Sequence, residues 1–234
     1  MSNILVIAAH PDDEILGCGA TIAKHTKAGD EVHVVILAEG ATSRDDKRDS
    51  ERRSLDLRGL AESAHKAGEI LKVTSLSLHD FPDNRMDSVD LLDVVKVIEK
   101  HINRIQPELI YTHHAGDLNI DHRITHEAVI TTCRPMPGQS LKTLLFFEVP
   151  SSTELRISGI FLPFAPNWFV DVSNTIGLKL EALKIYHSEM RPWPHSRSIK
   201  AVELLARWRG ASVGIEAAEA FMVGRIIIRS EVAL

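Results

Sequence analysis

Short apolar runs alternate with segments of helical periodicity through the first half of the chain. Apolar runs of this length, bounded by turn-forming residues, are typical of strands buried on both faces of a sheet. We predict four such strands, at ILVIAA (4–9), EVHVVILAEG (31–40), VTSLSL (73–78) and ELIYTHH (108–114). Helices are predicted between them, at about 16–28, from the charged segment 41–53 on to about Leu71, and at 91–105. The alternation predicts an α/β fold, a doubly wound and mostly parallel sheet (Rossmann-like) with helices on both faces.

The pattern becomes less regular after Arg134. We predict strands at TLLFFEV (143–149), WFVDVS (168–173) and MVGRIIIR (222–229), and helices near 175–187 and 198–211. The proline-bounded connection 150–170 is a candidate lid or subunit contact, so a homo-oligomer is a candidate assembly. We find no domain boundary, and residues 1–234 are therefore predicted to form a single domain.

Three segments rich in acids and histidines directly follow predicted strands. They are AHPDDE (9–14), HDFPDN (79–84) and HHAGDLNIDH (113–122). Parallel strands bring their carboxyl ends to one edge of the sheet, and ligands of open α/β sheets bind beyond that edge. We therefore expect the three segments to form one polar site.

The first of these segments places three carboxylates in a row, Asp12, Asp13 and Glu14, at the end of a buried strand. Like charges in such a position repel one another and are costly to desolvate, which predicts a divalent cation. His10 and Asp13 are three residues apart and suit two ligands on a turn. With His122 as a third ligand, one position stays open for water, as in a catalytic zinc site. We expect one Zn²⁺ per chain.

Asp12 is next to a predicted ligand and is a candidate to take the proton from that water. Glu14 lies at a helix start, where a negative charge is favourable, and is expected to be structural or to support the ligands. Two other interpretations remain. HPDD alone can be a helix N-cap cluster, and His122 and His126, four residues apart, can themselves form a metal pair.

The AHPDDE motif after the first strand, with DLNIDH after the fourth, resembles the PIG-L/LmbE family of zinc-dependent N-deacetylases. The similarity extends over most of the chain, to helix positions around Arg58 and Glu62, to FPDNRMD (81–87) and to ALKIYHSEM (182–190).

The resemblance implies that His10, Asp13 and His122 are the zinc ligands and that Asp12 is the general base. These are the roles that the chemistry of the residues also suggests. Family members hydrolyse an N-acetyl group, usually of a 2-acetamido sugar, through an oxyanion held by the metal and a nearby donor.

One departure from the family pattern concerns the second motif. Many relatives carry HPDH, whereas this chain reads Asn-Ile-Asp-His at 119–122. Asn119 can donate a hydrogen bond to the oxyanion but cannot act as a general acid. We therefore expect the leaving amine to be protonated by Asp12 or by another histidine, with His187 and His195 as candidates from this chain or a neighbouring subunit.

Further residues are candidates for supporting or substrate-binding roles. Asp121 can hydrogen-bond a ligand histidine or cap the next helix. Asp83 and Arg85 are expected to face the site, where they can bind sugar hydroxyls or an anionic group, although a local ion pair in a turn is an equal alternative. Arg58 and Arg197 are the other candidate substrate contacts, Arg197 as part of a basic cluster with tryptophans.

Composition narrows the function classes. The net charge of −5 gives no general case for nucleic-acid binding, and no apolar run is long enough for a membrane span. Two cysteines are too few for a disulfide framework, which indicates a reduced, cytoplasmic setting. We predict an enzyme that acts on a small-molecule amino sugar and releases acetate. The alternatives are hydrolysis of a non-sugar amide and, in another class, a non-catalytic nucleotide- or sugar-binding module.

Overall fold

The computed structural model describes residues 1–157, 159 and 163–228. Within these residues seven strands form one sheet in the order β3-β2-β1-β4-β5-β7-β6. The strands are β1 (Asn3–Ala8), β2 (Glu31–Ala38), β3 (Ser75–Phe81), β4 (Leu109–His113), β5 (Thr143–Phe147), β6 (Trp168–Asp171) and β7 (Ala218–Ile226). The pairs between β3 and β5 in this order are parallel, and β7 is antiparallel to both of its neighbours. The predicted fold class, a mostly parallel α/β sheet, is confirmed.

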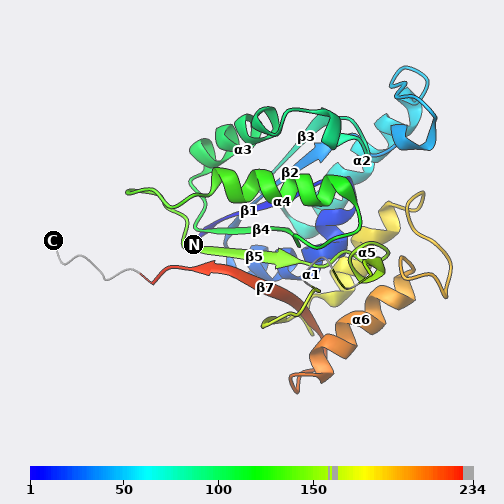
Figure 1. The fold of residues 1–234 in the computed structure, drawn as a ribbon. Helices are drawn as coiled ribbons and strands as arrows, with labels where there is room; N and C mark the ends of the chain where they lie inside the picture. Colours follow the sequence, from blue (N-terminus) through cyan, green and yellow to red (C-terminus); the bar gives the residue numbers. More distant parts are fainter. Residues whose placement is uncertain (158, 160–162, 229–234) are drawn as a thin grey trace.

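Helices cover both faces of the sheet (Figure 1). They are α1 (Asp13–Ala28), α2 (Ser54–Leu71), α3 (Leu91–Ile105), α4 (Ile120–Thr132), α5 (Ile176–Ile185) and α6 (Ile199–Ala211). Alternate residues of β1 divide between two cores: Ile4 and Val6 pack with α1, α2 and α5, whereas Leu5 and Ile7 pack with α3 and α4. None of the described helices is long and apolar enough to cross a membrane.

Some predicted boundaries differ from the structure. Helix α1 begins at Asp13 rather than near residue 16, because Asp13 and Glu14 occupy its first turn, where negative charge is favourable. Strand β3 continues to Phe81, whose backbone pairs with β2, so the predicted loop 79–87 begins inside the strand. Strand β7 begins at Ala218 rather than 222, because its first residues pair with β6. The predicted end of that strand at 229 lies outside the described residues.

Helix α1 packs unusually close to the sheet. A Cβ atom added to Gly17 would lie 2.4 Å from Cδ2 of Phe147 in β5. The following residue, Cys18, has non-helical angles (φ −147°, ψ 23°), so α1 is interrupted directly after this contact. Only glycine permits this approach of the helix that carries the acidic motif.

We expect Gly17→Ala to lower the free energy of unfolding by about 1–3 kcal/mol, because the new methyl group overpacks the contact with Phe147. Gly59→Ala is the matched control: its site on α2 is exposed and open, and we expect a gain of about 0.5–1 kcal/mol from helix propensity. Urea unfolding of both variants measures the difference. Equal stability of the two variants would show that the contact is not as close as described.

Candidate active site

Three predicted ligands meet at the carboxyl ends of β1 and β4. His10 Nδ1 and His122 Nε2 each lie 3.1 Å from Asp13 Oδ2. The turn after β1 sets the first two: the His10 amide donates to Asp13 Oδ2 at 2.9 Å, and the Asp13 amide donates to the His10 carbonyl at 3.2 Å. His122 comes from the first turn of α4. One ligand atom from each of the three residues lies within 4.8 Å of the others.

A carboxylate stands behind each of the two histidines. Asp121 Oδ2 lies 2.9 Å from His10 Nε2, and Asp117 Oδ1 lies 3.1 Å from His122 Nδ1. Such carboxylates fix the ring orientation of metal-binding histidines and raise their basicity. Asp121 therefore lies beside a candidate ligand histidine, as expected. That histidine is His10 and not His122, its neighbour in the sequence. Asp117 was not predicted, and its only sequence signal is its position in the same acidic segment.

These carboxylates are themselves held by loops from other strands. Asp121 accepts hydrogen bonds from the backbone amides of Asn84 (2.6 Å) and Met86 (2.9 Å), in the loop after β3. Asp117 accepts from the hydroxyls of Ser152 and Thr153, in the loop after β5. The orientation of the two histidines therefore depends on four strand ends.

The donor set fits a metal ion. Two imidazole nitrogens and one carboxylate oxygen form a three-ligand set of the kind found in catalytic zinc sites. Asp13 Oδ1 is buried and has no hydrogen-bond partner among the described residues, which is unusual for a carboxylate oxygen unless another group binds it.

A second set of possible ligand atoms, His10, Asp83 and Asp121, fits less well. Both oxygens of Asp121 already accept backbone hydrogen bonds. Asp83 Oδ2 accepts from the Ser43 amide at 3.0 Å, and its Oδ1 accepts from the Asn84 side chain at 3.0 Å. We therefore assign the candidate metal position to the set that contains Asp13.

The pKa values of the site residues also indicate that the carboxylates favour a positive charge at this place. Burial opposes the charge on His122, but Asp13 and Asp117 outweigh it and raise its pKa to about 9. Burial likewise opposes the charge on Asp13, yet the histidines hold its pKa well below the usual value. Because a metal-binding imidazole must be deprotonated, a metal ion at this place would replace the proton on His122.

Asp12 lies in a strained backbone conformation beside the ligands. Its φ of 117° and ψ of −27° are uncommon for any residue except glycine, and residues held in this way cluster at functional sites. The side chain is 3% exposed, and Oδ2 lies 3.2 Å from Nη1 of Arg197. Burial raises the pKa of Asp12, and Arg197 acts in the opposite direction.

Glu14 supports the strained turn. Its Oε2 accepts from the Asp12 amide at 3.0 Å, and its Oε1 accepts from the Tyr186 hydroxyl at 2.7 Å. Burial raises its pKa to about 7. Tyr186 is fully buried. We predicted a site role for His187 of the YHSE segment, but the residue of this segment that bonds to Glu14 is Tyr186.

Several predicted site residues are not brought to the candidate metal position. His187 is exposed, with Nδ1 beside the Ile185 carbonyl, and His195 is exposed and accepts from the Arg197 amide. Arg58 is exposed and bonds to Ser54 of its own helix. None of these placements supports the catalytic or substrate role expected from the sequence.

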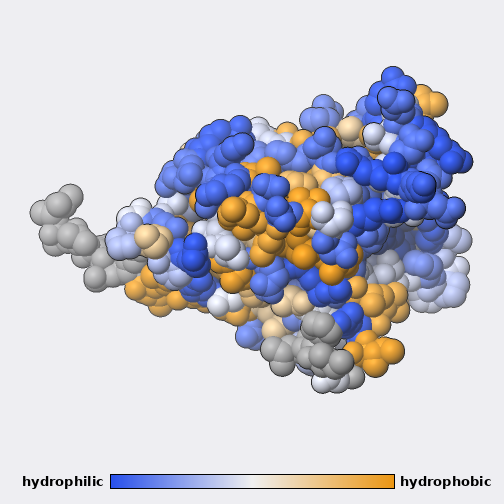
Figure 2. Space-filling view, turned by 45° about the horizontal axis from the view of Figure 1, so that its top comes forward, coloured by the Kyte–Doolittle hydropathy of each residue, from blue (hydrophilic) through white to orange (hydrophobic). Residues whose placement is uncertain are grey.

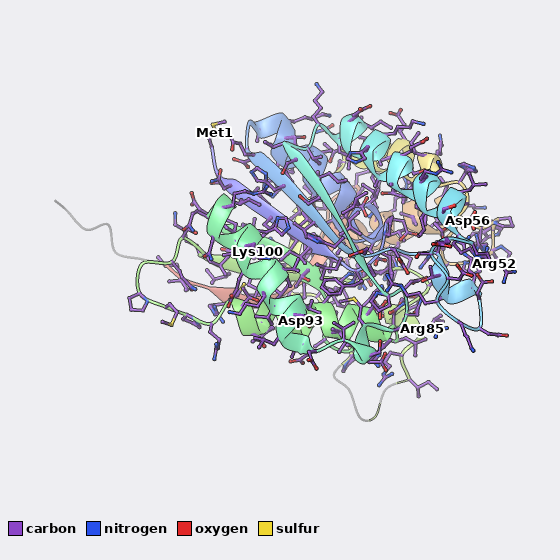
Figure 3. All side chains as sticks on the ribbon, turned by 90° about the horizontal axis from the view of Figure 1, so that it is seen from above. Met1, Arg52, Asp56, Arg85, Asp93 and Lys100 are labelled. Atoms are coloured by element: carbon purple, nitrogen blue, oxygen red, sulfur yellow. The ribbon has the colours of Figure 1, made fainter. Side chains whose placement is uncertain are left out.

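Other predicted residues lie nearby but serve the scaffold. Asn119 caps α4 by accepting from the Asp121 amide, and its NH₂ group donates to Asn84. Asp83 is buried 3.3 Å from His10 Nε2, where it fixes loops rather than facing a sugar hydroxyl. Arg85 donates to the carbonyls of Asp45 and Asp46 and so fixes the charged segment 41–53. Figure 3 shows Arg85 at the same end of the molecule as Arg52 and Asp56, away from Met1.

Two further histidines pack around His122. His113 stacks on its ring with centroids 4.0 Å apart, and Nε2 of His113 accepts from the Ala9 amide at 2.8 Å. His126 is buried and its Nδ1 lies 2.9 Å from the His113 carbonyl. His126 is therefore placed as a packing residue and not as the partner of His122 in a metal pair.

Comparison with known proteins identifies a family and several curated relatives, of which two are described here. Residues 5–133 match the PIG-L family, described as GlcNAc-PI de-N-acetylase. The chain is 29% identical over 195 residues to "Uncharacterized deacetylase YaiS" of Escherichia coli K12, which covers 80% of this chain and 91% of that protein. It is 31% identical over 200 residues to diacetylchitobiose deacetylase of Thermococcus kodakarensis, which covers 81% of this chain and 70% of that protein.

The fold is shared with proteins of different activity. GalB, the 4-carboxy-2-hydroxymuconate hydratase of Pseudomonas putida KT2440, superposes with a TM-score of 0.75 at 24% identity and covers 100% of both chains. Fold alone therefore does not decide the reaction. The family match spans more than half of the sequence and contains His10, Asp13 and His122, and the chain belongs to the PIG-L family.

Proposed function

We propose that this protein is a zinc-dependent hydrolase that removes the N-acetyl group from an amino sugar of the N-acetylglucosamine type, or from its conjugate, and releases acetate. The observation that carries the proposal is the buried carboxyl of Asp12 beside the set His10, Asp13 and His122. The family description and the name of the Thermococcus relative, both of which specify deacetylation, support it.

One zinc ion per chain would be held by His10, Asp13 and His122, with Asp121 and Asp117 orienting the two rings. When bound, the ion polarises the amide carbonyl and lowers the pKa of a water molecule at the site. A carboxylate behind each histidine keeps its ligand nitrogen basic and in place.

Asp12 is the proton carrier in this proposal. Water adds to the amide carbon, and one of its protons passes to the Asp12 carboxylate. Arg197 holds Oδ2, which leaves Oδ1 for the proton. When the carbon–nitrogen bond breaks, the same proton passes to the leaving amine nitrogen.

No second proton donor is needed for this cycle. The histidine that many relatives carry is replaced by Asn119, whose side chain is occupied by Asp121 and Asn84. His187 and His195 are exposed and bond elsewhere. Asp12 is thus the group proposed to act as both base and acid, and Arg197 is the cation that binds its carboxylate.

The surroundings of the site favour a polar substrate. The segment 41–53 after β2 projects beside the site and is strongly hydrophilic (Figure 2). Arg44 from this segment pairs with Glu189 at 2.5 Å. We propose a small water-soluble sugar conjugate as the substrate. Cys18 and Cys133 are both free and buried, which supports the proposed reduced, cytoplasmic setting.

Metal binding tests the ligand set. We expect chelator-treated protein to bind one zinc ion per chain and to release protons near pH 7.5, because the carboxylates beside His10 and His122 raise the pKa of both rings and the metal replaces their protons. Titration calorimetry in buffers of different ionisation enthalpy measures both quantities. Asp117→Asn should weaken zinc binding about 10–100-fold through loss of support for His122.

The control for this experiment is on the same helix. We expect His122→Ala to lose zinc binding, whereas His126→Ala should change the affinity less than about threefold, since His126 only packs behind the site. Loss of zinc in both variants would instead favour a metal pair of the two histidines.

Acetate release tests the reaction. We expect release from at least one member of a panel of free, nucleotide-linked, thiol-conjugated and oligomeric N-acetylglucosamine substrates. Asp12→Asn should lower kcat by about 10²–10⁴-fold with zinc affinity unchanged, because only the proton carrier is removed. Simultaneous loss of zinc would make Asp12 a ligand. Release only from non-sugar N-acetyl compounds would replace the substrate class.

Two histidine variants test the identity of the proton donor. We expect His187→Ala and His195→Ala each to keep kcat within about twofold of the unchanged protein, because neither ring reaches Asp12. A drop of about tenfold or more in either variant, measured on the substrate identified by the panel, would move the general-acid role from Asp12 to that histidine.

A further inference from the structure

A buried ion pair is inserted into the interruption of α1. Lys179 of α5 and Glu219 of β7 are each 4% exposed, and their charged atoms are 2.6 Å apart. Within the described part of the chain, the hydrogen bonds of the two side chains go to each other and to the backbone of α1, and not to the candidate metal ligands. A buried pair of this kind stabilises little compared with apolar packing, so its presence calls for another explanation.

The pair replaces one particular helical hydrogen bond. In a continuous helix the Ala20 amide would donate to the Leu16 carbonyl. Here the Ala20 amide donates to Glu219 Oε1 at 3.1 Å, and the Leu16 carbonyl accepts from Lys179 Nζ at 2.8 Å. The Thr21 amide also donates to Glu219, at 2.6 Å. The two charged side chains therefore satisfy the backbone amide and carbonyl groups that the interruption of the helix leaves without helical partners.

A residue directly after α5 reaches α1 at a second point. Tyr186 is the C-cap residue of α5, and Lys179 lies in the first turns of the same helix. Tyr186 binds Glu14 ahead of the interruption, and Glu14 in turn binds the strained Asp12 backbone. Lys179 fixes the carbonyl end of that short helical segment, so the segment 13–17 is held at both ends.

We propose that Lys179 and Glu219 are positioning residues, which hold α1 in its interrupted form and thereby direct Asp12 and Asp13 toward His10 and His122. The inference rests on the proposed function, since it assigns those two carboxylates to the active site. A continuous helix through Cys18 would change the direction of the segment 13–17 relative to β1. The ion pair favours the interrupted form because that form supplies the further hydrogen-bond partners of both side chains, the Leu16 carbonyl for Lys179 and the amides of Ala20 and Thr21 for Glu219.

The test compares this pair with an exposed pair of the same kind. Lys142 and Glu108 are also 2.6 Å apart but lie at the amino ends of β4 and β5, opposite the site. We would measure zinc affinity by chelator competition, acetate release, and amide hydrogen exchange at Ala20 and Thr21. The variants are Lys179→Met, Lys179→Arg and Glu219→Gln, with Lys142→Met and Glu108→Gln as controls, at a temperature where each is folded.

We expect Lys179→Met and Glu219→Gln to weaken zinc binding by about tenfold or more and to speed exchange at Thr21, with partial recovery in Lys179→Arg. The control variants should match the unchanged protein. If the folded Lys179→Met and Glu219→Gln proteins bind zinc as the controls do, the positioning role is wrong, whatever their stability. If Lys179→Met does not fold, Glu219→Gln and Lys179→Arg decide by the same criterion.

The two proposals can fail separately. Absence of acetate release from every substrate, with zinc affinity still dependent on Lys179 and Glu219, would overturn the proposed reaction and uphold the positioning role. If substitution of Lys179 and Glu219 changes neither acetate release nor zinc affinity, the proposed reaction is upheld and the positioning role is overturned.

Discussion

The structure depends on how a group of buried carboxylates is neutralised. Six lie around the carboxyl ends of β1, β3 and β4, and all are at most 2% exposed: Asp12, Asp13, Glu14, Asp83, Asp117 and Asp121. Unpaired carboxylates in such a place would take up protons or unfold the region. The basic side chains beside them are His10, His113, His122 and Arg197, and backbone amides and hydroxyls satisfy most of the remaining oxygens. A metal ion beside Asp13, as proposed above, would complete this balance.

The same hydrogen bonds that satisfy the carboxylates also build the site. Asp121 hydrogen-bonds to both the loop after β3 and the turn after β1. Asp117 hydrogen-bonds to both the loop after β5 and the residue before α4. Each carboxylate thus fixes one histidine through groups from distant parts of the sequence. The positions of the site side chains are therefore fixed by hydrogen bonds between several loops at one edge of the sheet, and not by a single helix or strand.

Local sequence was enough to predict the positions of most strands and the three residues His10, Asp13 and His122 that the structure brings together. Apolar runs followed by acids identify the sheet edge, and the spacing of His10 and Asp13 identifies a turn with two ligands. The partners that depend on long-range contacts were not predictable in this way. Asp117 has no spacing signal toward His122, and Tyr186 reads as one more apolar position of a helix. Lys179 and Glu219 are 40 residues apart and meet only in the fold, where α5 supplies the lysine and β7 the glutamate.

The two parts of the chain contribute differently to the site. The family match at 5–133 contains the three candidate ligands, both supporting carboxylates and Asp12. The later residues contribute groups that act on those: Arg197 on Asp12, Tyr186 on Glu14, and the pair Lys179 and Glu219 on α1. In this chain the cation beside Asp12, the guanidinium of Arg197, therefore comes from beyond the matched region, and the matched residues alone do not set the charge environment of Asp12.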